Sequence, residues 1–478
     1  MLQEKLLNIV SEANKYISTY VLVILLVGIG IFYTVRTRFV QVRCFKEGMR
    51  RVFGKSEKND GKGLSSFQAL TTAVAAQVGT GNIVGACGAI LVGGPGAIFW
   101  MWVIAFFGMA TIYAEATLAQ KTRKVDADGT IHGGPVYYIK EAFRGKFGKF
   151  LAVFFGLAVI IALGFIGSMV QSNSIAESIG SITGDTAFNY NWIIGIVLVL
   201  ITGFVFIGGV KRIGAVTEKM VPIMAILYLL GGLFILLINL GKLPEAFELI
   251  FRYAFNPTAI IGGGLGFALK EAISQGAKRG LFSNEAGMGS TPHAHALADV
   301  KDPHDQGVVA MVGVFLDTFV VLTMTALVVI VTMYTEGGAL AEAGAASGVA
   351  KTSLMQTAVG TALGDLFAGV FSAEVCTAVG NIFIAVCLFF FALSTIISWN
   401  YFGKVNAEHL FGKVGVIVYS VISLIFIFLG TLTSNDLVWE LTDFVNYLMV
   451  LPNALALLTL SGMVIECAKL KKKNNPLD

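Results

Sequence analysis

The chain has 478 residues, of which 13% are charged and 56% are hydrophobic, and its formal net charge is +4. Soluble domains carry roughly 25% charged residues, so this composition excludes a soluble enzyme and indicates a protein that lies mostly inside a lipid bilayer. The 34 basic and 30 acidic residues are too evenly balanced to form a patch suited to nucleic acid.

Apolar runs that are long enough to cross a bilayer predict about eleven transmembrane helices. The first is expected at 17–35, and two groups of five follow it. The first group is expected at 68–92, 96–121, 150–175, 190–210 and 217–240. The second group is expected at 258–285, 307–335, 375–402, 413–433 and 437–465. The predicted fold class is therefore an all-α polytopic membrane protein.

The distribution of Lys and Arg orients these helices. Most of the 34 basic residues lie in one set of alternate connections, namely 36–66, 121–149, 211–219, 286–306, 403–414 and the C-terminal tail. Cytoplasmic loops retain positive charge because basic loops are poorly translocated. The sequence therefore predicts a multi-pass protein of the cell membrane with its N-terminus outside and its C-terminus in the cytoplasm.

The helix pattern divides the chain into four segments. Residues 1–64 are expected to form the extracytoplasmic N-terminus, a peripheral first helix and a basic cytoplasmic loop. Residues 65–240 and 258–465 are expected to form two repeats of five helices, and 466–478 a basic cytoplasmic tail. An odd number of helices gives the two repeats opposite orientations, which is the arrangement of many inverted-repeat secondary transporters.

Glycine interrupts one predicted span in each repeat. Gly79 and Gly81 flank Thr80 in the first, and a run at 262–264 followed by Gly266 opens the second. Each glycine inside a helix costs up to about 1 kcal/mol relative to Ala. Small residues also serve helix packing, but a run of them at membrane depth favours unwound backbone, which must be satisfied by protein or water. We therefore expect broken helices near 79–82 and 262–267.

A broken helix offers two kinds of ligand at the membrane midplane. The N-terminus of a half-helix presents free N–H groups that bind a carboxylate without a buried Lys or Arg. Unwound carbonyls, together with hydroxyls such as those of Ser394, Thr395 and Ser398, can hold a small cation. The alternative is that these hydroxyls bond back to their own helix. The pattern favours a carrier of amino acids with a coupling cation.

Four motifs resemble the alanine/glycine:cation symporter family: VGTGNIVG at 78–85, GGPGAIFWMWVIAFFGM at 93–109, RGLFSNEAGMGSTPHAHA at 279–296 and FALSTIISWNYFGK at 391–404. The family is similar to the leucine-transporter fold, which implies an inverted repeat of 5+5 helices behind a peripheral first helix. The resemblance also implies sodium-coupled import of alanine, glycine or both by alternating access, with Na⁺ as the coupling ion.

The same resemblance implies which residues bind the ligands. The substrate would be bound by Gly79, Thr80, Gly81, Asn82, Gln171, Gly263, Gly264, Phe267 and Trp399. Sodium would be held by Ala75, Val78, Phe391, Ser394 and Thr395. Within this pattern Leu265, Gly266 and Phe267 resemble the unwound stretch of the second broken helix. Trp399 and Phe267 would face each other across a pocket with room for a side chain no larger than a methyl group.

Other functions remain as alternatives. Acids in transmembrane spans are candidate proton relays, and four are found in or at the ends of the predicted spans: Glu115, Glu271, Asp317 and Glu374. Asp317 lies deepest, so a proton-coupled carrier through Asp317 is the first alternative. A small-solute channel is the second, although the sequence contains no repeated filter loop. A membrane-embedded enzyme is a further alternative, disfavoured because no nucleophile and base can be paired.

The cysteines and histidines indicate no metal centre in the sequence. The five cysteines lie mostly in apolar segments without C-x-x-C or Cys/His spacing, at positions 44, 87, 376, 387 and 467. His293 and His295 are two residues apart and lack neighbouring ligands of the right spacing. The sequence therefore predicts neither a disulfide nor a zinc site.

Overall fold

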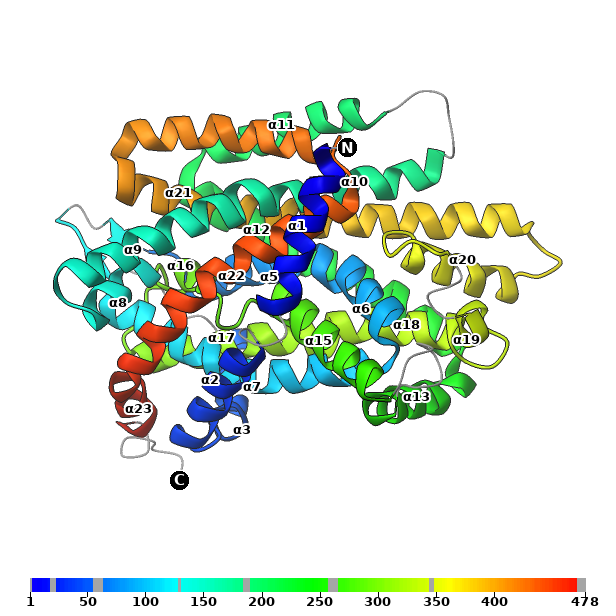
Figure 1. Ribbon diagram of the computed structural model, residues 1–478, viewed down its shortest axis with the longest axis horizontal. Coiled ribbons are helices and arrows are strands. Elements are labelled where there is room, and N and C mark those ends of the chain that lie inside the picture. The colour runs from blue at the N-terminus through cyan, green and yellow to red at the C-terminus, as the bar shows by residue number, and fades with distance from the viewer. Residues whose placement is uncertain are drawn as a thin grey trace.

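The computed structural model describes residues 2–17, 23–54, 63–127, 130–183, 190–256, 265–343 and 348–470, and these are almost entirely helical (Figure 1). Within them the only strands are β1 (Lys124–Val125) and β2 (Ile131–His132), which pair antiparallel. The expected all-α architecture is therefore confirmed.

Four α-helices precede the first predicted repeat among the described residues. They are α1 (Leu2–Tyr16), α2 (Val23–Arg36), α3 (Val40–Arg43) and α4 (Phe45–Phe53). α2 corresponds to the first predicted span and packs against α7 (Gly96–Thr122). The sequence search missed α1, which contacts α22 (Asn435–Thr459) and places Asn14 2.9 Å from the carbonyl oxygen of Glu440.

The described helices of the first predicted repeat follow next in the chain. They are α5 (Ser66–Gln77), η2 (Gly81–Gly85), α6 (Ala86–Gly93), α7, α8 (Pro135–Ala142), α9 (Gly145–Val159), η3 (Ile160–Gly167), α10 (Ser168–Thr183), α11 (Asn191–Ile207) and α12 (Gly209–Ile238). η2 and η3 are π-helical segments within longer helices. The short η4 (Leu240–Lys242) and α13 (Leu243–Phe255) connect this group to the next.

In the described part of the chain, the second group starts with α15 (Leu265–Asn284). It continues with α16 (Pro292–His295), α17 (Pro303–Val314), the π-helical η5 (Phe315–Leu322), α18 (Thr323–Met333), α19 (Ala339–Ala343), α20 (Leu354–Leu366), α21 (Ala373–Gly430), α22 and α23 (Ser461–Leu470). α21 contains two predicted spans, and Gly412 with a φ of 67° kinks the chain between them.

Several described helices can cross a bilayer. Six are long and apolar enough, and a seventh candidate is the pair Ser66–Gln77 and Gly81–Gly93, which bends by 47°. α2 and α11 are apolar but shorter. Apolar side chains on the periphery are exposed, as with Phe204 at 68% and Ile207 at 87%, which is the surface that lipid covers. The chain is a multi-pass membrane protein.

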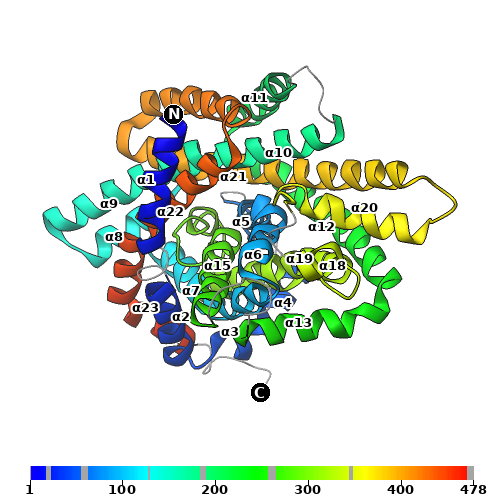
Figure 2. The same ribbon diagram turned by 45° about the vertical axis from the view of Figure 1, so that its right-hand side comes forward.

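The bent pair lies at the centre of the molecule. Figure 2 shows α5 and α6 surrounded by other helices, and every residue of α5 from Ala69 to Gln77 is buried. α5 contacts α12, α17 and α21, whereas α6 contacts α7 and α15. Elements from both predicted repeats therefore meet around the first glycine-rich break.

The sequence search also missed α20, which packs against α21. At 13 residues it is shorter than the roughly 20 that a transmembrane helix needs, so a search for long apolar runs passes over it. Glycine permits the contact: a methyl group added at Gly380 would lie 2.8 Å from the backbone nitrogen of Gly360. Small residues at such crossings are typical of membrane helices.

Candidate functional site

The chain leaves helical hydrogen bonding between α5 and η2. In a continuous helix the N–H groups of Gly79 and Thr80 would bond to carbonyls four residues earlier. Instead, Gly79 N donates to Asn82 Oδ1 at 3.0 Å, and Thr80 N donates to Gln171 Oε1 at 3.2 Å. The carbonyls at the end of α5, including that of Ala75, are thereby freed from their helical partners.

Side chains of α21 approach these freed carbonyls. Thr395 Oγ1 lies 2.9 Å from Ala75 O, 3.1 Å from Phe391 O and 3.5 Å from Val78 O. Ser394 Oγ lies 2.8 Å from Phe391 O and 3.4 Å from Ala75 O. A hydroxyl has a single proton to donate, so it cannot satisfy several carbonyls at once. We call these three carbonyl and two hydroxyl oxygens the five-oxygen cluster.

All the residues expected to hold sodium therefore lie together, and each of them is buried. The cluster contains only uncharged oxygens, which are ligands that a small hard cation accepts where helices unwind in transporters. Its members come from helices more than 300 residues apart in the chain. The role of the cluster in sodium binding stays a prediction at this point.

Gly79 allows α21 to come this close. A methyl group added at Gly79 would lie 2.3 Å from Thr395 Oγ1 and 3.2 Å from Gln171 Oε1. The first distance is well below van der Waals contact, and the atoms on both sides are held by hydrogen bonds. Any side chain at this position would therefore displace Thr395 from the five-oxygen cluster.

A buried carboxylate ties the first break to two other helices. Asp317 in η5 accepts from Asn82 Nδ2 at 2.6 Å, from Ser283 Oγ at 2.9 Å and from Thr318 Oγ1 at 2.8 Å. The partners of this deepest acid are thus an amide and two hydroxyls from η2, α15 and η5. Asp317 fixes the position of Asn82, which in turn holds the N–H of Gly79.

A second interruption of a helix faces the first. α15 ends at Asn284, and Glu285, Gly287 and Gly289 have positive φ values of 57°, 93° and 79°. Glu115 on α7 accepts the N–H of Gly287 at 3.1 Å and that of Gly289 at 2.9 Å. A buried carboxylate therefore satisfies backbone groups that unwinding has freed, as membrane depth requires.

The two interruptions touch through the end of α15. A methyl group added at Gly81 would lie 3.2 Å from Ser283 Cα and 3.0 Å from the ring of Phe282. Glycine at 81 thus lets η2 lie directly against α15 near its C-terminal end.

This position differs from the expected second break near 262–267. Leu265, Gly266 and Phe267 lie in the first turn of α15, so the structure has helix there. Gly263 and Gly264 lie outside the described residues. The physical reason for the interruption after Asn284 is that Gly287 and Gly289 adopt left-handed backbone, which ends a helix.

Trp399 lies near this second interruption and is fully buried. Its Nε1 donates to Glu285 Oε1, and its ring meets the ring of Phe282 edge-on with centroids 5.8 Å apart. On the other side it packs against η3, where a methyl group added at Gly167 would lie 2.6 Å from the ring. Phe282 therefore faces Trp399, whereas the side chain of Phe267, which was expected there, lies outside the described part of the structure.

Two buried hydroxyls near the first break and Trp399 are without a hydrogen-bond partner among the described residues. They are Thr80 Oγ1 and Ser398 Oγ. A buried polar atom left unpaired costs roughly 1–3 kcal/mol. A polar ligand that bonds to such an atom removes this cost, so these atoms indicate a ligand-binding position. Thr80 was among the expected substrate residues, and Ser398 lies one residue before Trp399.

Residues that sequence reasoning missed are concentrated at the end of α15. Phe282, Ser283 and Glu285 all contact predicted site residues. Their signal was present in the motif at 279–296, in which Gly287 and Gly289 follow an acid. The glycine run at 262–264 is the longer glycine pattern, so the sequence favours a break there instead.

Buried ion pairs connect α15 to α22. Arg279 and Asp443 form a bidentate pair at 3.2 and 2.9 Å, and Lys278 lies 3.5 Å from the same carboxylate. The Arg279 guanidinium also stacks 4.7 Å from the ring of Trp439. These side chains are almost completely buried, so this closure lies inside the helix bundle.

A cavity of about 400 Å³ opens beyond Trp399, at the end of the first part of α21. It is lined by Asp126, Thr130, Ile131, His132, Gly133, Tyr137, Val210, Leu297, Tyr401, Lys404, Val405, Glu408 and His409. Most of these side chains come from the predicted cytoplasmic loops. The cavity and the Arg279–Asp443 pair therefore belong to different parts of the bundle.

The chain is similar to known transporters along nearly its whole length. The sodium:alanine symporter family matches residues 3–475. The chain is 40% identical to the sodium/alanine symporter AgcS of Methanococcus maripaludis, covering 97% of this chain and 96% of that protein. It is 39% identical to YrbD of Bacillus subtilis, described as a putative sodium/proton-dependent alanine carrier, covering 95% and 90%.

A solved structure confirms the fold. MhsT in complex with L-phenylalanine superposes with a TM-score of 0.58 at 15% identity, covering 86% of this chain and 90% of that one. The similarity identifies the leucine-transporter fold. The family's members are transporters rather than enzymes. The chain belongs to the sodium:alanine symporter family and is a cation-coupled amino-acid symporter.

Proposed function

We propose that the protein imports alanine, glycine or both together with Na⁺ by alternating access. The observation that carries the proposal is the five-oxygen cluster, in which Thr395 Oγ1 lies within 3.5 Å of three carbonyl oxygens. Sodium at this position joins the end of α5 to α21. It thereby stabilises the broken conformation around Gly79, where the substrate binds.

The chemistry of the cluster favours sodium over a proton as the coupling ion. Carbonyl and aliphatic hydroxyl oxygens do not titrate near neutral pH, so these ligands can bind a metal cation but cannot store a proton. Proton coupling would instead use Asp317, whose carboxylate is already bonded to Asn82, Ser283 and Thr318. Those bonds stabilise its charged form and support a structural role.

The substrate carboxylate is proposed to bind at the break between Gly79 and Asn82. Here Asn82 and Gln171 hold the backbone N–H groups of Gly79 and Thr80, and an incoming carboxylate takes their place. The buried Thr80 and Ser398 hydroxyls provide further donors. The N–H groups bind the anion without a formal positive charge in the membrane.

Trp399 and Phe282 limit the size of the substrate side chain. Their rings meet edge-on at 5.8 Å, and Trp399 is also packed against Gly167. Both rings are buried. Alanine and glycine therefore fit, whereas longer side chains are excluded by steric overlap.

Alternating access is supported by the unequal closure of the two ends of the site. We assign the buried Arg279–Asp443 pair to the extracellular side and the 400 Å³ cavity to the cytoplasmic side. This assignment follows the positive-inside rule, which places the N-terminus outside and the C-terminus in the cytoplasm of the cell membrane. A channel would need a path open at both ends.

The function is tested by uptake of radiolabelled alanine into proteoliposomes with an inward sodium gradient, an inward proton gradient or neither. We expect uphill accumulation with sodium alone and competition by unlabelled glycine. Accumulation with a proton gradient alone would indicate that transport is coupled to protons through Asp317. Flux without saturable counterflow would indicate a channel, and no alanine flux under any gradient would contradict the substrate.

Removing either hydroxyl of the five-oxygen cluster should weaken sodium activation. We expect Ser394→Ala and Thr395→Ala each to raise the sodium concentration for half-maximal uptake about fivefold or more, because one such contact is worth about 1 kcal/mol or more. Ser420→Ala is the matched control, since Ser420 bonds only to the Val416 carbonyl of its own helix. Unchanged sodium activation in both variants would remove the cluster from the coupling site.

Adding a methyl group at Gly79 should disrupt the cluster from the other side. Gly79→Ala forces Thr395 away, and overpacking of this kind costs about 1–3 kcal/mol. We expect sodium-dependent uptake to fall at least tenfold at equal protein level. Gly85→Ala is the control, because the nearest atom to its added methyl group is at 3.7 Å. Equal activity of the two variants would show that the close approach of α21 is dispensable.

Shortening Phe282 should relax the size limit. In Phe282→Ala we expect larger neutral amino acids to compete with alanine uptake, which they do not do in the unmodified protein. Phe426→Ala removes the same ring volume from a stack with Phe165 outside the site and should leave selectivity unchanged. Competition profiles that are identical in the two variants would disprove the role of Phe282.

A further inference from the structure

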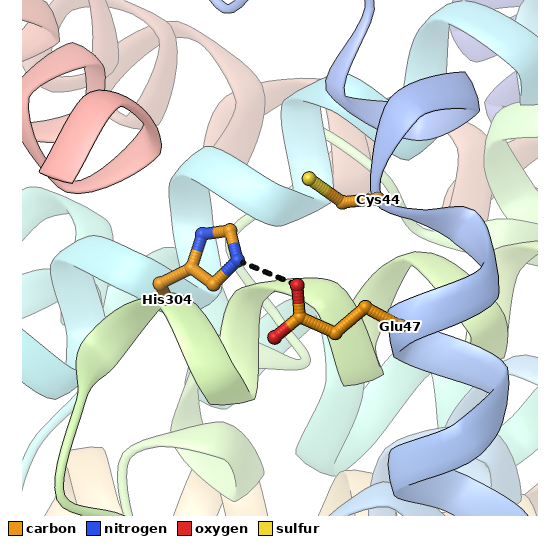
Figure 3. A group of neighbouring side chains, drawn as sticks. All are labelled: Cys44, Glu47 and His304. Carbon is orange, nitrogen blue, oxygen red and sulfur yellow. Dashed lines mark hydrogen bonds and ion pairs between the residues drawn. The ribbon is translucent and has the colours of Figure 1, made fainter. Parts of the chain in front are cut away.

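Three potential metal ligands meet away from the transport site, as Figure 3 shows: Cys44, Glu47 and His304. Cys44 lies in the tight turn between α3 and α4, Glu47 follows one turn later on α4, and His304 lies at the start of α17. Their ligand atoms are all within 4.8 Å of one another. A thiolate, an imidazole and a carboxylate are the ligand types that zinc prefers.

The distance between His304 and Glu47 fits a shared metal better than a direct ion pair. His304 Nε2 lies 3.5 Å from Glu47 Oε2, whereas a charge-assisted hydrogen bond is about 2.7–2.9 Å long. Two ligands at about 2.1 Å from a tetrahedral zinc ion are about 3.4 Å apart. The two atoms are therefore already spaced as neighbouring ligands of one ion.

Neighbouring side chains orient both ligands toward the same point. The Tyr113 hydroxyl lies 2.8 Å from His304 Nδ1, which directs Nε2 at Glu47. Arg51 binds Glu47 through Oε1 at 3.1 Å, so that Oε2 faces the histidine. A hydrogen bond to the second nitrogen of a ligating histidine is the usual support of a zinc site.

The burial of the three residues is also suitable for a metal site. Cys44 and His304 are buried at 7% and 1% relative exposure, while the Glu47 side chain is 25% exposed. An ion therefore reaches the three ligands from the solvent-exposed side of the Glu47 carboxylate. The thiol and imidazole lie behind it, protected from solvent and from oxidants.

We propose that Cys44, Glu47 and His304 bind one Zn²⁺ ion, with a water molecule as the fourth ligand. Binding converts the Cys44 thiol to a thiolate and releases its proton to solvent. The ion would fasten α4, which lies outside the predicted repeats, to α17 inside the second one.

The sequence pattern does not indicate this site. Cys44 and Glu47 are three residues apart, but His304 follows Glu47 only after 257 residues. No local Cys/His spacing exists, which is why the sequence predicted no zinc. The site contains none of the residues proposed to bind sodium or the amino acid. The zinc proposal can therefore be tested independently of the transport proposal.

The test is metal binding by the full-length protein in detergent after treatment with a chelator. We expect one equivalent of Zn²⁺ to be retained on gel filtration, and Co²⁺ to give the absorption band of a thiolate–cobalt bond. Cys44→Ser should abolish this band and weaken zinc binding at least tenfold. Cys376→Ser is the matched control, because Cys376 is also buried but lies on α21.

Glu47→Gln provides a second variant in case Cys44→Ser fails to fold. Its partly exposed side chain keeps its shape, so we expect the same melting temperature without metal and at least tenfold weaker zinc binding. Zinc should raise the melting temperature of the unmodified protein and not that of the variant. Absence of stoichiometric zinc, or an identical cobalt band in the Cys44→Ser and Cys376→Ser variants, would overturn the proposal and leave an ordinary histidine–carboxylate contact.

Discussion

The interruption of the helix after α5 is the constraint on which the site depends. In the membrane interior each unpaired N–H or carbonyl group costs several kcal/mol, so a broken helix survives only where other groups replace its bonds. Asn82 and Gln171 take the two freed N–H groups, and Thr395 lies against the freed carbonyls. These replacements come from three different helices. A ligand that supplies better partners at the same point therefore stabilises one arrangement of those helices over another.

The second interruption is held in a related way, and the two are connected. Glu115 accepts two N–H groups of the stretch that follows α15, while Asp317 joins Ser283 at the end of α15 to Asn82 in η2. Glu115 thus bonds to backbone groups for which a soluble protein would use water, whereas Asp317 holds side chains of both interruptions. Because Trp399 bonds to Glu285 just beyond Ser283, the wall of the proposed substrate pocket is coupled to the same network. Sodium and amino acid are expected to influence each other through these shared supports.

The sequence could predict the fold for a physical reason, and the residues of the five-oxygen cluster through the family resemblance. Long apolar runs must become helices in a bilayer, and the first glycine-rich break is short and flanked by polar residues. It could not place the second break, because the run at 262–264 and the pair Gly287 and Gly289 look alike without backbone angles. Nor could it find α20, which is too short to span, or bring Cys44 to His304, since only tertiary packing joins them. What the cluster binds stays a prediction.

The most direct measurement is equilibrium binding of alanine to the purified protein as a function of sodium, paired with sodium binding as a function of alanine. If the ion and the substrate stabilise the same broken helix, each must raise the affinity of the other by the same factor, because linkage is reciprocal. We predict equal factors of at least about fivefold in the unmodified protein and a factor near one in the Thr395→Ala variant. Alanine affinity that is independent of sodium, or coupling that survives intact without the Thr395 hydroxyl, would contradict the account.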